Sequence, residues 1–185
     1  MFPASFAKER SPQENWACEP MKIAIASDHA GFRLKEEIKQ LLRELGHEVR
    51  DFGAHSEEPV DYPDFIVQAA DAVRRAECER AIVLGGSGNG EAMVANKVPG
   101  IRCALCHDVT TARLARAHND ANVLALGQRI TGSEVAKDVV EMWLDTPFEG
   151  GRHQRRLDKM AAVEAKLAGR AAPARSGAHK TRRGG

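Results

Sequence analysis

The segment of the sequence with the clearest chemistry is the glycine-rich run 85–91, GGSGNGE, in which four of the first six residues are glycine. Such a run lets backbone N–H groups converge on an anion at the start of a helix. No Gly-Lys-Ser/Thr follows, and Glu91 stands where a dinucleotide loop has its third glycine, so neither nucleotide motif fits. We expect the run to hold an oxyanion formed during a reaction. A purely structural turn is the alternative.

Glu91 comes directly after this run. A glutamate in the first turn of a helix is commonly explained by the helix dipole alone. Beside an anion-binding loop, however, the negative charge of a carboxylate would repel the ligand, so its presence favours a role in the reaction. Accepting a proton from carbon is such a role, so Glu91 is a candidate general base.

Other polar side chains follow the ends of predicted elements. Asp28 and His29 come directly after the first predicted strand, where they can bind hydroxyl groups and a negative group, or Asp28 can simply cap the next helix. His118 and Asn119 end a predicted helix, either as capping residues or as a general acid with a hydroxyl-binding amide. Arg129 follows the last predicted strand, where a phosphate could be bound.

A cluster of cations begins the last predicted helix, with Arg152, His153 and Arg156 among its residues. Cations at a helix N-terminus oppose the macrodipole at a cost of roughly 0.3–1 kcal/mol each, so their presence favours a bound anion. Arginine suits phosphate because its guanidinium donates two hydrogen bonds at once. A solvated basic face is the alternative. Base, acid, oxyanion loop and phosphate site together suit proton abstraction next to a carbonyl of a phosphorylated sugar, without a metal.

Short apolar runs and helical periods alternate along the chain and position these side chains. The predicted strands span 22–27, 48–52, 80–84, 101–106 and 122–126, and the predicted helices span 31–45, 62–78, 91–97, 109–118, 133–144 and 153–167. This alternation predicts an α/β fold with a five-stranded parallel sheet between two helical layers. Ligands of such sheets bind at the carboxyl ends of the strands.

Composition limits the classes of protein that remain. Lysine plus arginine is 27 and aspartate plus glutamate is 26, a balance that argues against coating nucleic acid or a membrane. No apolar run approaches the roughly 20 residues that span a bilayer. The four cysteines fit reduced thiols in a cytoplasmic protein. Cys103 and Cys106 form a C-x-x-C, but no second pair completes a zinc site.

A single folded domain is expected over residues 21–167, since one domain usually has about 100–200 residues. Residues 1–20 lack periodicity and lack the continuous apolar core of a signal peptide, so we expect a disordered extension. Residues 168–185 carry five basic and no acidic side chains among Gly, Ala and Pro, which predicts a disordered basic tail.

Taken together, the motifs resemble those of ribose-5-phosphate isomerase type B, in the sugar-phosphate isomerase family that includes galactose-6-phosphate isomerase subunits. The similar segments are Asp28-His29-Ala30-Gly31-Phe32, Asp61-Tyr62-Pro63, Gly85 to Glu91, Ala95-Asn96-Lys97, Gly100-Ile101-Arg102, His118-Asn119, Asn122-Val123-Leu124 and Gly151-Arg152-His153-Gln154. They cover about Met21 to Leu167 in the same order. Several independent motifs make the resemblance specific.

The resemblance implies a Rossmann-like fold and the interconversion of ribose 5-phosphate and ribulose 5-phosphate through a cis-enediolate, in the non-oxidative pentose phosphate pathway. It further implies no metal or other cofactor, and a homodimer with active sites at its interface. One branch of the family uses a cysteine base just before the glycine loop, where this chain has Gly85. The other, seen in mycobacterial relatives, has the run found here and uses its glutamate, so Glu91 inherits the role of base.

The remaining roles carry over from the family. His118 would open the furanose ring with help from Asp28, and Asn119 would bind a sugar hydroxyl. The resemblance allows the partner subunit to supply both His118 and Asn119. The enediolate oxygens would be held by the loop amides and the Ser87 hydroxyl, within Gly86, Ser87, Gly88, Asn89 and Gly90. The phosphate would be bound by Arg129, Arg152 and Arg156, with His29 and His153 nearby.

Two alternatives remain open from the sequence. The same chemistry would act on another aldose or ketose phosphate, of six or four carbons, because an arginine cluster does not measure chain length. A noncatalytic protein that binds sugar phosphates or nucleotides would also fit the fold. Either alternative keeps a small-molecule ligand and predicts no membrane or nucleic-acid partner.

Overall fold

The computed structural model describes residues 19–168, so the predictions for residues 1–18 and 169–185 lie outside the described part of the chain. Its centre is a five-stranded sheet in the order β2-β1-β3-β5-β4, with all neighbouring strands parallel. The strands are β1 (Lys22–Ser27), β2 (Glu48–Asp51), β3 (Arg80–Gly85), β4 (Cys103–Leu105) and β5 (Val123–Gly127). The predicted α/β fold is confirmed.

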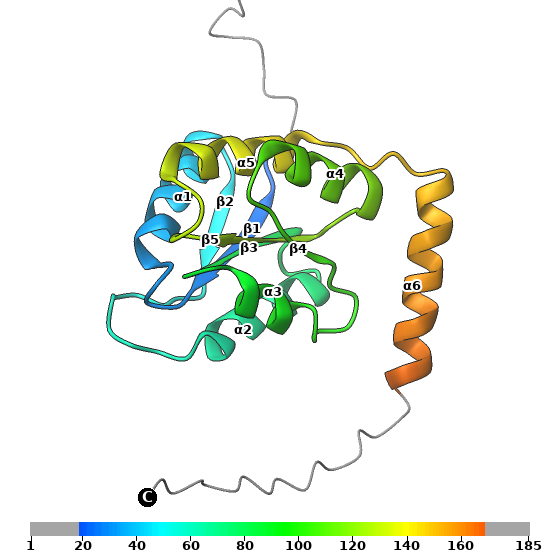
Figure 1. The fold of residues 1–185 in the computed structure, drawn as a ribbon, viewed down its shortest axis with the longest axis horizontal. Coiled ribbons are helices and arrows are strands. Elements are labelled where there is room, and N and C mark those ends of the chain that lie inside the picture. The colour runs from blue at the N-terminus through cyan, green and yellow to red at the C-terminus, as the bar shows by residue number, and fades with distance from the viewer. Residues whose placement is uncertain (1–18, 169–185) are drawn as a thin grey trace, which may run out of the picture.

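Helices cover both faces of the sheet (Figure 1). One layer contains α1 (Phe32–Glu44), α4 (Val109–Asn119) and α5 (Ser133–Asp145), and the other contains α2 (Tyr62–Arg74) and α3 (Asn89–Ala95). The last helix, α6 (Arg152–Ala168), stands apart from both layers at one side of the domain (Figure 1). No helix within residues 19–168 has the length and apolar character that crossing a membrane requires.

The two cores follow from the alternation of side chains along buried strands. In β1, Ile23 and Ile25 face the layer of α1, α4 and α5, whereas Ala24 and Ala26 face the layer of α2 and α3. The same alternation runs through β3 and β5, so these central strands are apolar on both faces, as parallel sheets require. Trp143 of α5 is fully buried in the first core.

Element boundaries differ from prediction mainly where the backbone turns sharply. Helix α2 stops at Arg74 rather than Cys78, because Ala76 adopts a positive φ of 56°. Strand β4 begins at Cys103, two residues later than predicted, since the N–H of Ile101 donates to the carbonyl of Val98 in a turn. Helix α3 begins at Asn89, so Glu91 lies within its first turn.

The direction of the strands decides which loops can meet. In the sheet register Gly85, the last residue of β3, pairs with Gly127, the last residue of β5. The loops that follow β1, β3 and β5 therefore lie at one edge, which we call the carboxyl edge. Because α4 runs back to the start of β5, its last residues lie at the opposite, amino edge.

Candidate active site

The glycine run folds over the carboxyl ends of β3 and β5. The N–H of Gln128 donates to the carbonyl of Gly85, and the N–H of Arg129 donates to the carbonyl of Gly86, both at 2.9 Å. Gly88 has a φ of 79°, a left-handed conformation that favours glycine. A Cβ atom at Gly127 would overlap the backbone of Ser87, so the loop lies directly on β5. The close approach fixes the loop directly over the carboxyl ends of these two strands.

The side chain of Glu91 is 4% exposed and turns back onto the end of β3. A Cβ atom built on Gly85 would overlap the carboxylate of Glu91. Position 85 therefore has no room for a side chain while Glu91 keeps this place. The carboxylate thus lies where a side chain of residue 85 would begin.

Burial raises the pKa of the Glu91 carboxyl above its ordinary value of 4.5, and the negative charge of Asp28 adds to the rise. Hydrogen bonds from the backbone amides of Glu91 and Gly88 lower the pKa but do not cancel the rise. A carboxylate with a raised pKa is a stronger base toward a proton on carbon.

Asp28 is buried at the end of β1, next to β3. Its Oδ1 accepts hydrogen bonds from the N–H groups of Ala30 at 2.9 Å and Gly31 at 3.0 Å. The N-cap residue of α1 is Gly31, so Asp28 shapes the turn before the helix rather than occupying the cap position itself. The charge of Asp28 thereby stays near that of Glu91.

His29 and Arg129 complete this side of the site. Nδ1 of His29 lies 3.2 Å from the backbone nitrogen and 3.3 Å from the carbonyl oxygen of Val60, which holds the ring beside the segment after β2. The guanidinium of Arg129 lies beside the loop, with Nη1 3.3 Å from where a Cβ on Gly86 would be. We call the set at this edge, namely Asp28, His29, Gly86 to Gly90, Glu91 and Arg129, the carboxyl-edge half-site.

The chain places His118 and Asn119 away from Glu91. They are the last two residues of α4, four to five residues before β5 begins. The five residues of β5 span roughly 13 Å between the two edges of the sheet. Asp120, with a φ of 44°, caps α4, so neither His118 nor Asn119 is the C-cap residue.

His118 instead packs against the start of α6. Its ring stacks on that of His153, with centroids 4.2 Å apart and an angle of 6° between the planes. Arg152 donates from Nε to Nε2 of His153 at 3.2 Å. Burial lowers the pKa of His153, and interactions with His118 and the Arg152 guanidinium lower it further. We call the set His118, Asn119, Arg152, His153 and Arg156 the amino-edge half-site.

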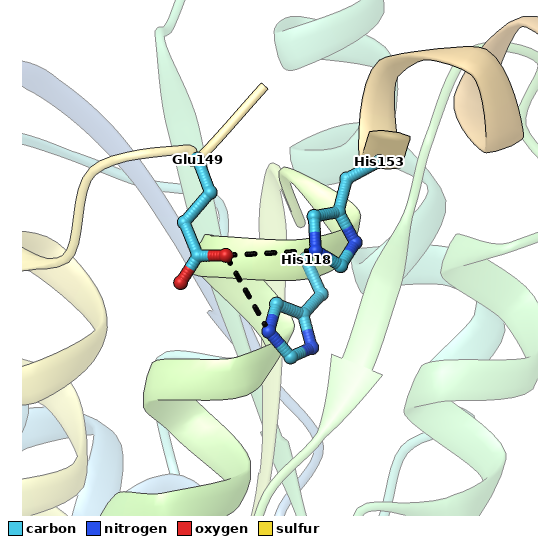
Figure 2. A group of neighbouring side chains, drawn as sticks. All are labelled: His118, Glu149 and His153. Carbon is cyan, nitrogen blue, oxygen red and sulfur yellow. Dashed lines mark ion pairs between the residues drawn. The ribbon is translucent and has the colours of Figure 1, made fainter. Parts of the chain in front are cut away.

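Two residues near these half-sites were not singled out for a role from the sequence. The ring of Tyr62 lies against Gly90, where a Cβ would meet Cζ at 2.8 Å. Glu149 reaches both stacked histidines from the segment between α5 and α6 (Figure 2). In the sequence, only the four-residue spacing between Glu149 and His153 could have pointed to Glu149.

The described cysteines do not offer a thiolate base. Cys78, Cys103 and Cys106 carry free thiols, and burial raises the pKa of each above its ordinary value, that of Cys106 to about 11. Cys18 lies outside the described residues. Among the described groups at the carboxyl edge, the carboxylate of Glu91 is therefore the better base.

Known proteins share most of this chain. Residues 23–160 match the family described as Ribose/Galactose Isomerase. Ribose-5-phosphate isomerase B of Escherichia coli is 47% identical over 143 residues, which cover 77% of this chain and 96% of that protein. The enzyme of the same name from Mycolicibacterium paratuberculosis is 45% identical over 146 residues, covering 78% and 92%. A solved structure of ribose-5-phosphate isomerase B from Clostridium thermocellum matches with a TM-score of 0.79 at 52% identity, covering 80% and 99%.

Proposed function

The chain belongs to the ribose/galactose isomerase family, and on that premise we propose that it interconverts D-ribose 5-phosphate and D-ribulose 5-phosphate. The resemblance drawn from the sequence motifs is confirmed for the family. The reaction is an aldose–ketose isomerisation of the non-oxidative pentose phosphate pathway. The observation that carries the proposal is the buried carboxylate of Glu91, held against the glycine loop at the carboxyl edge.

In the proposed reaction, Glu91 is the base that moves a proton between neighbouring carbons. The carboxylate removes the C2 proton of the open-chain aldose, and the C1–C2 double bond of a cis-enediolate forms as the carbonyl electrons move to O1. Glu91 then delivers the proton to C1, while the hydroxyl proton on O2 passes to O1, so that C2 becomes the ketone and C1 carries a hydroxyl. The raised pKa of Glu91 supports this role.

We assign the stabilisation of the enediolate to the amides of the run Gly86 to Gly90. Amides placed before the reaction need no reorganisation as charge develops, and losing one such donor commonly costs about 3–4 kcal/mol of barrier. The Ser87 hydroxyl lies within the same loop, where its Oγ accepts from the N–H of Asn89 at 3.3 Å. Carboxylate, imidazole and amides supply each proposed step, so we propose a reaction without a metal cofactor.

The acid and the remaining phosphate ligands lie at the amino edge, so we propose that a second copy of the chain completes each site. His118 of one copy would open the furanose ring with Asp28 of the other, and Asn119 would bind a hydroxyl. Arg152, His153 and Arg156 would join His29 and Arg129 around the phosphate. The cationic amino-edge half-site complements a carboxyl-edge half-site that holds two buried acids, Asp28 and Glu91.

The surface of α6 supports this homodimer. Met160, Val163 and Leu167 recur every three to four residues along the helix and are 49–58% exposed. An exposed apolar stripe of this kind favours a protein partner. Because α6 lies outside both helical layers of its own domain (Figure 1), a second copy is the partner that would also complete the divided site. We place the enzyme in the cytoplasm, which the free thiols of the described cysteines favour.

A comparison of substrates tests the proposal. Purified protein is assayed with ribose 5-phosphate and with four- and six-carbon aldose phosphates, and kcat/KM is measured for each. We expect the largest value for ribose 5-phosphate. A larger value for another sugar phosphate would reassign the substrate, and binding of ribose 5-phosphate without any ketose product would identify a noncatalytic sugar-phosphate-binding protein.

A further inference from the structure

The last turn of α4 is held by a guanidinium group from another segment of the chain. Arg102 lies directly before β4, and its Nε donates to the carbonyls of Asn119 and Asp120, both at 3.0 Å. Its Nη2 donates to the same carbonyl of Asp120 at 2.7 Å. We propose that Arg102 is a positioning residue of the isomerase: it holds the last turn of α4 so that His118 and Asn119 reach the sugar phosphate together.

The contact satisfies groups that a helix leaves without partners at its end. The last carbonyls of an α-helix accept no hydrogen bond from the helix itself, and the negative end of the helix dipole attracts a cation. At the end of α4 the carbonyl of Ala117 accepts from the N–H of Glu149 at 3.0 Å, and that of Asn119 accepts from Arg102. Asn119 is thereby fixed at its carbonyl although the residue is exposed. An exposed amide on a fixed backbone is suited to binding a sugar hydroxyl.

The segment that carries Arg102 is itself tied to the sheet. The N–H of Arg102 donates to Oδ1 of Asn122 at 2.8 Å, and Nδ2 of Asn122 donates to the carbonyl of Gly100 at 3.0 Å. Asn122 directly precedes β5, whose residues are all buried. The guanidinium therefore extends from a fixed base, and its contacts define where α4 ends relative to the sheet.

A second guanidinium holds the same turn from the other side. Asp120 has a left-handed φ of 44°, a conformation that aspartate tolerates better than most residues other than glycine. Its Oδ2 accepts from Nη2 of Arg102 at 2.8 Å, and its Oδ1 accepts from Nη1 of Arg116 at 2.7 Å. The side chain of Arg116 is only 8% exposed, and its Nη1 also donates to the carbonyl of Ala121 at 2.8 Å. The turn that follows Asn119 is thus fixed between two arginines.

The role of Arg102 in the reaction rests on the proposed function. His118, the proposed acid, and Asn119, the proposed hydroxyl ligand, are consecutive residues, so a shift of the last turn of α4 moves both relative to the substrate. A misplacement of about 1 Å can cost about 100-fold in rate. Lysine at position 102 would keep the positive charge but lacks the planar fork of donors that binds two carbonyls and a carboxylate at once. Arg102→Lys therefore tests position rather than charge.

Steady-state kinetics of the full chain with ribose 5-phosphate test the proposal. In Arg102→Lys we expect kcat to fall at least about tenfold. KM should change much less, because the proposed phosphate ligands lie on α6 and at the carboxyl edge. The folded fraction of each variant is measured by circular dichroism, and kcat is calculated per folded protein. Equal kcat in Arg102→Lys and the wild type would overturn the proposal.

Arg80→Lys is the matched control. Nη1 of Arg80 donates to the carbonyls of Trp143 and Leu144 near the end of α5, so this arginine also holds the end of a helix. Helix α5 carries no residue of either half-site, and we expect wild-type kcat per folded protein in Arg80→Lys. A fall equal to that of Arg102→Lys would show a merely structural role and overturn the proposal.

A measurement without turnover separates this proposal from the enzymatic one. The ring of His118 stacks on that of His153 (Figure 2), so the nuclear magnetic resonance signals of the His118 ring report its position. These signals, assigned with His118→Asn, should shift in Arg102→Lys and stay in place in Arg80→Lys. Unchanged signals in Arg102→Lys would overturn the proposal. Shifted signals in a protein that does not convert ribose 5-phosphate would refute the proposed function but support the hold of Arg102 on the end of α4.

Asp120→Asn is a second variant for the case that Arg102→Lys does not fold. Asparagine tolerates the left-handed φ, so the turn is kept while the ion pairs with Arg102 and Arg116 are lost. We expect a kcat below that of the wild type and a shift of the same His118 signals. Wild-type kcat, or unchanged signals, would overturn the proposal.

Discussion

At the scale of single residues, a side chain at position 85 would occupy the same volume as the carboxylate of Glu91. The carboxylate of Glu91 fills the volume next to the Cα of Gly85, so glycine at 85 and glutamate at 91 depend on each other. The sequence made Glu91 a candidate base, because a carboxylate beside an anion-binding loop would repel the ligand unless it has a chemical role. It did not reveal that the base lies back on the strand, since this depends on the path of the whole loop.

A side chain at position 85 should therefore disturb catalysis. In Gly85→Ala the new Cβ overlaps the Glu91 carboxylate and moves it, and a displacement of about 1 Å can cost about 100-fold in rate. We expect kcat to fall by this order, with little change in the secondary structure seen by circular dichroism. Gly132→Ala is the control, because nothing lies within 4 Å of its added Cβ, and wild-type kcat is expected. Equal kcat in both variants would show that Glu91 need not occupy this place.

The pair Asp28 and Glu91 predicts a pH effect. Activity requires the ionised carboxylate, so the rate should rise with pH through a pKa above 4.5. The negative charge of Asp28 contributes to that raised pKa, so Asp28→Asn should move the acidic limb of the kcat/KM profile to lower pH, besides reducing the rate. The full profile of both proteins is measured at constant ionic strength. A limb that stays in place, or moves to higher pH, would contradict the assignment of that limb to Glu91.

At the scale of elements, periodicity predicted the order and type of helices and strands, but not the turns. The end of α2 depends on the positive φ of Ala76, which no local residue pattern indicated. The sequence likewise did not predict a buried lysine in α1. Lys35 is fully buried and donates to Asp51 of β2 at 2.9 Å and to the carbonyl of Ala54 at 2.6 Å. These contacts hold the segment after β2 in place. The same segment places the backbone of Val60 against the ring of His29.

The ion pair between Lys35 and Asp51 should make the free energy of unfolding depend on pH in the acidic range. Burial alone would raise the pKa of Asp51, but hydrogen bonds from Lys39, Lys35 and the Gly53 amide lower it from 3.8 to about 2. Because the folded-state pKa is lowered, the stabilisation is present above pH 4 and is lost as the pH falls toward 2.

Asp51→Asn leaves the Lys35 charge poorly paired, so the free energy of unfolding at pH 7 should fall by about 3 kcal/mol. The variant should also lose part of the wild-type dependence of stability on pH between 4 and 2. Guanidinium unfolding at several pH values measures both effects. Glu57→Gln, which breaks an exposed pair with Arg33, serves as control and should change stability much less. Similar losses in the two variants would contradict a special role for the buried pair.

At the scale of the whole molecule, the candidate site is divided between two edges of one sheet. The rule that ligands bind at the carboxyl ends of parallel strands pointed to the carboxyl-edge half-site, which contains Glu91, since the loops after such strands meet at one edge. The other half lies at the end of a helix that runs back across the sheet, and its contact with α6 is a tertiary feature that periodicity does not encode. Local sequence patterns thus singled out candidate residues but did not give their arrangement.

The divided site predicts complementation between two inactive variants. If each site takes Glu91 from one copy and His118 from the other, a mixed dimer of Glu91→Gln and His118→Asn contains one intact site. The purified mixed dimer should then have about half of wild-type activity, and a random mixture of equal amounts about a quarter. The variants are co-expressed with different tags, and the mixed dimer is purified and assayed. Mixed dimers without activity would place both residues of a site in the same copy.

The most direct test of the account follows hydrogen at the two reacting carbons. Wild type and Glu91→Gln are incubated with ribose 5-phosphate in heavy water, and deuterium at C1 and C2 is followed by nuclear magnetic resonance, with substrate binding measured separately. The account predicts deuterium incorporation by the wild type, and almost none by Glu91→Gln although it still binds the sugar phosphate. Incorporation by Glu91→Gln at the wild-type rate would contradict the assignment of the base.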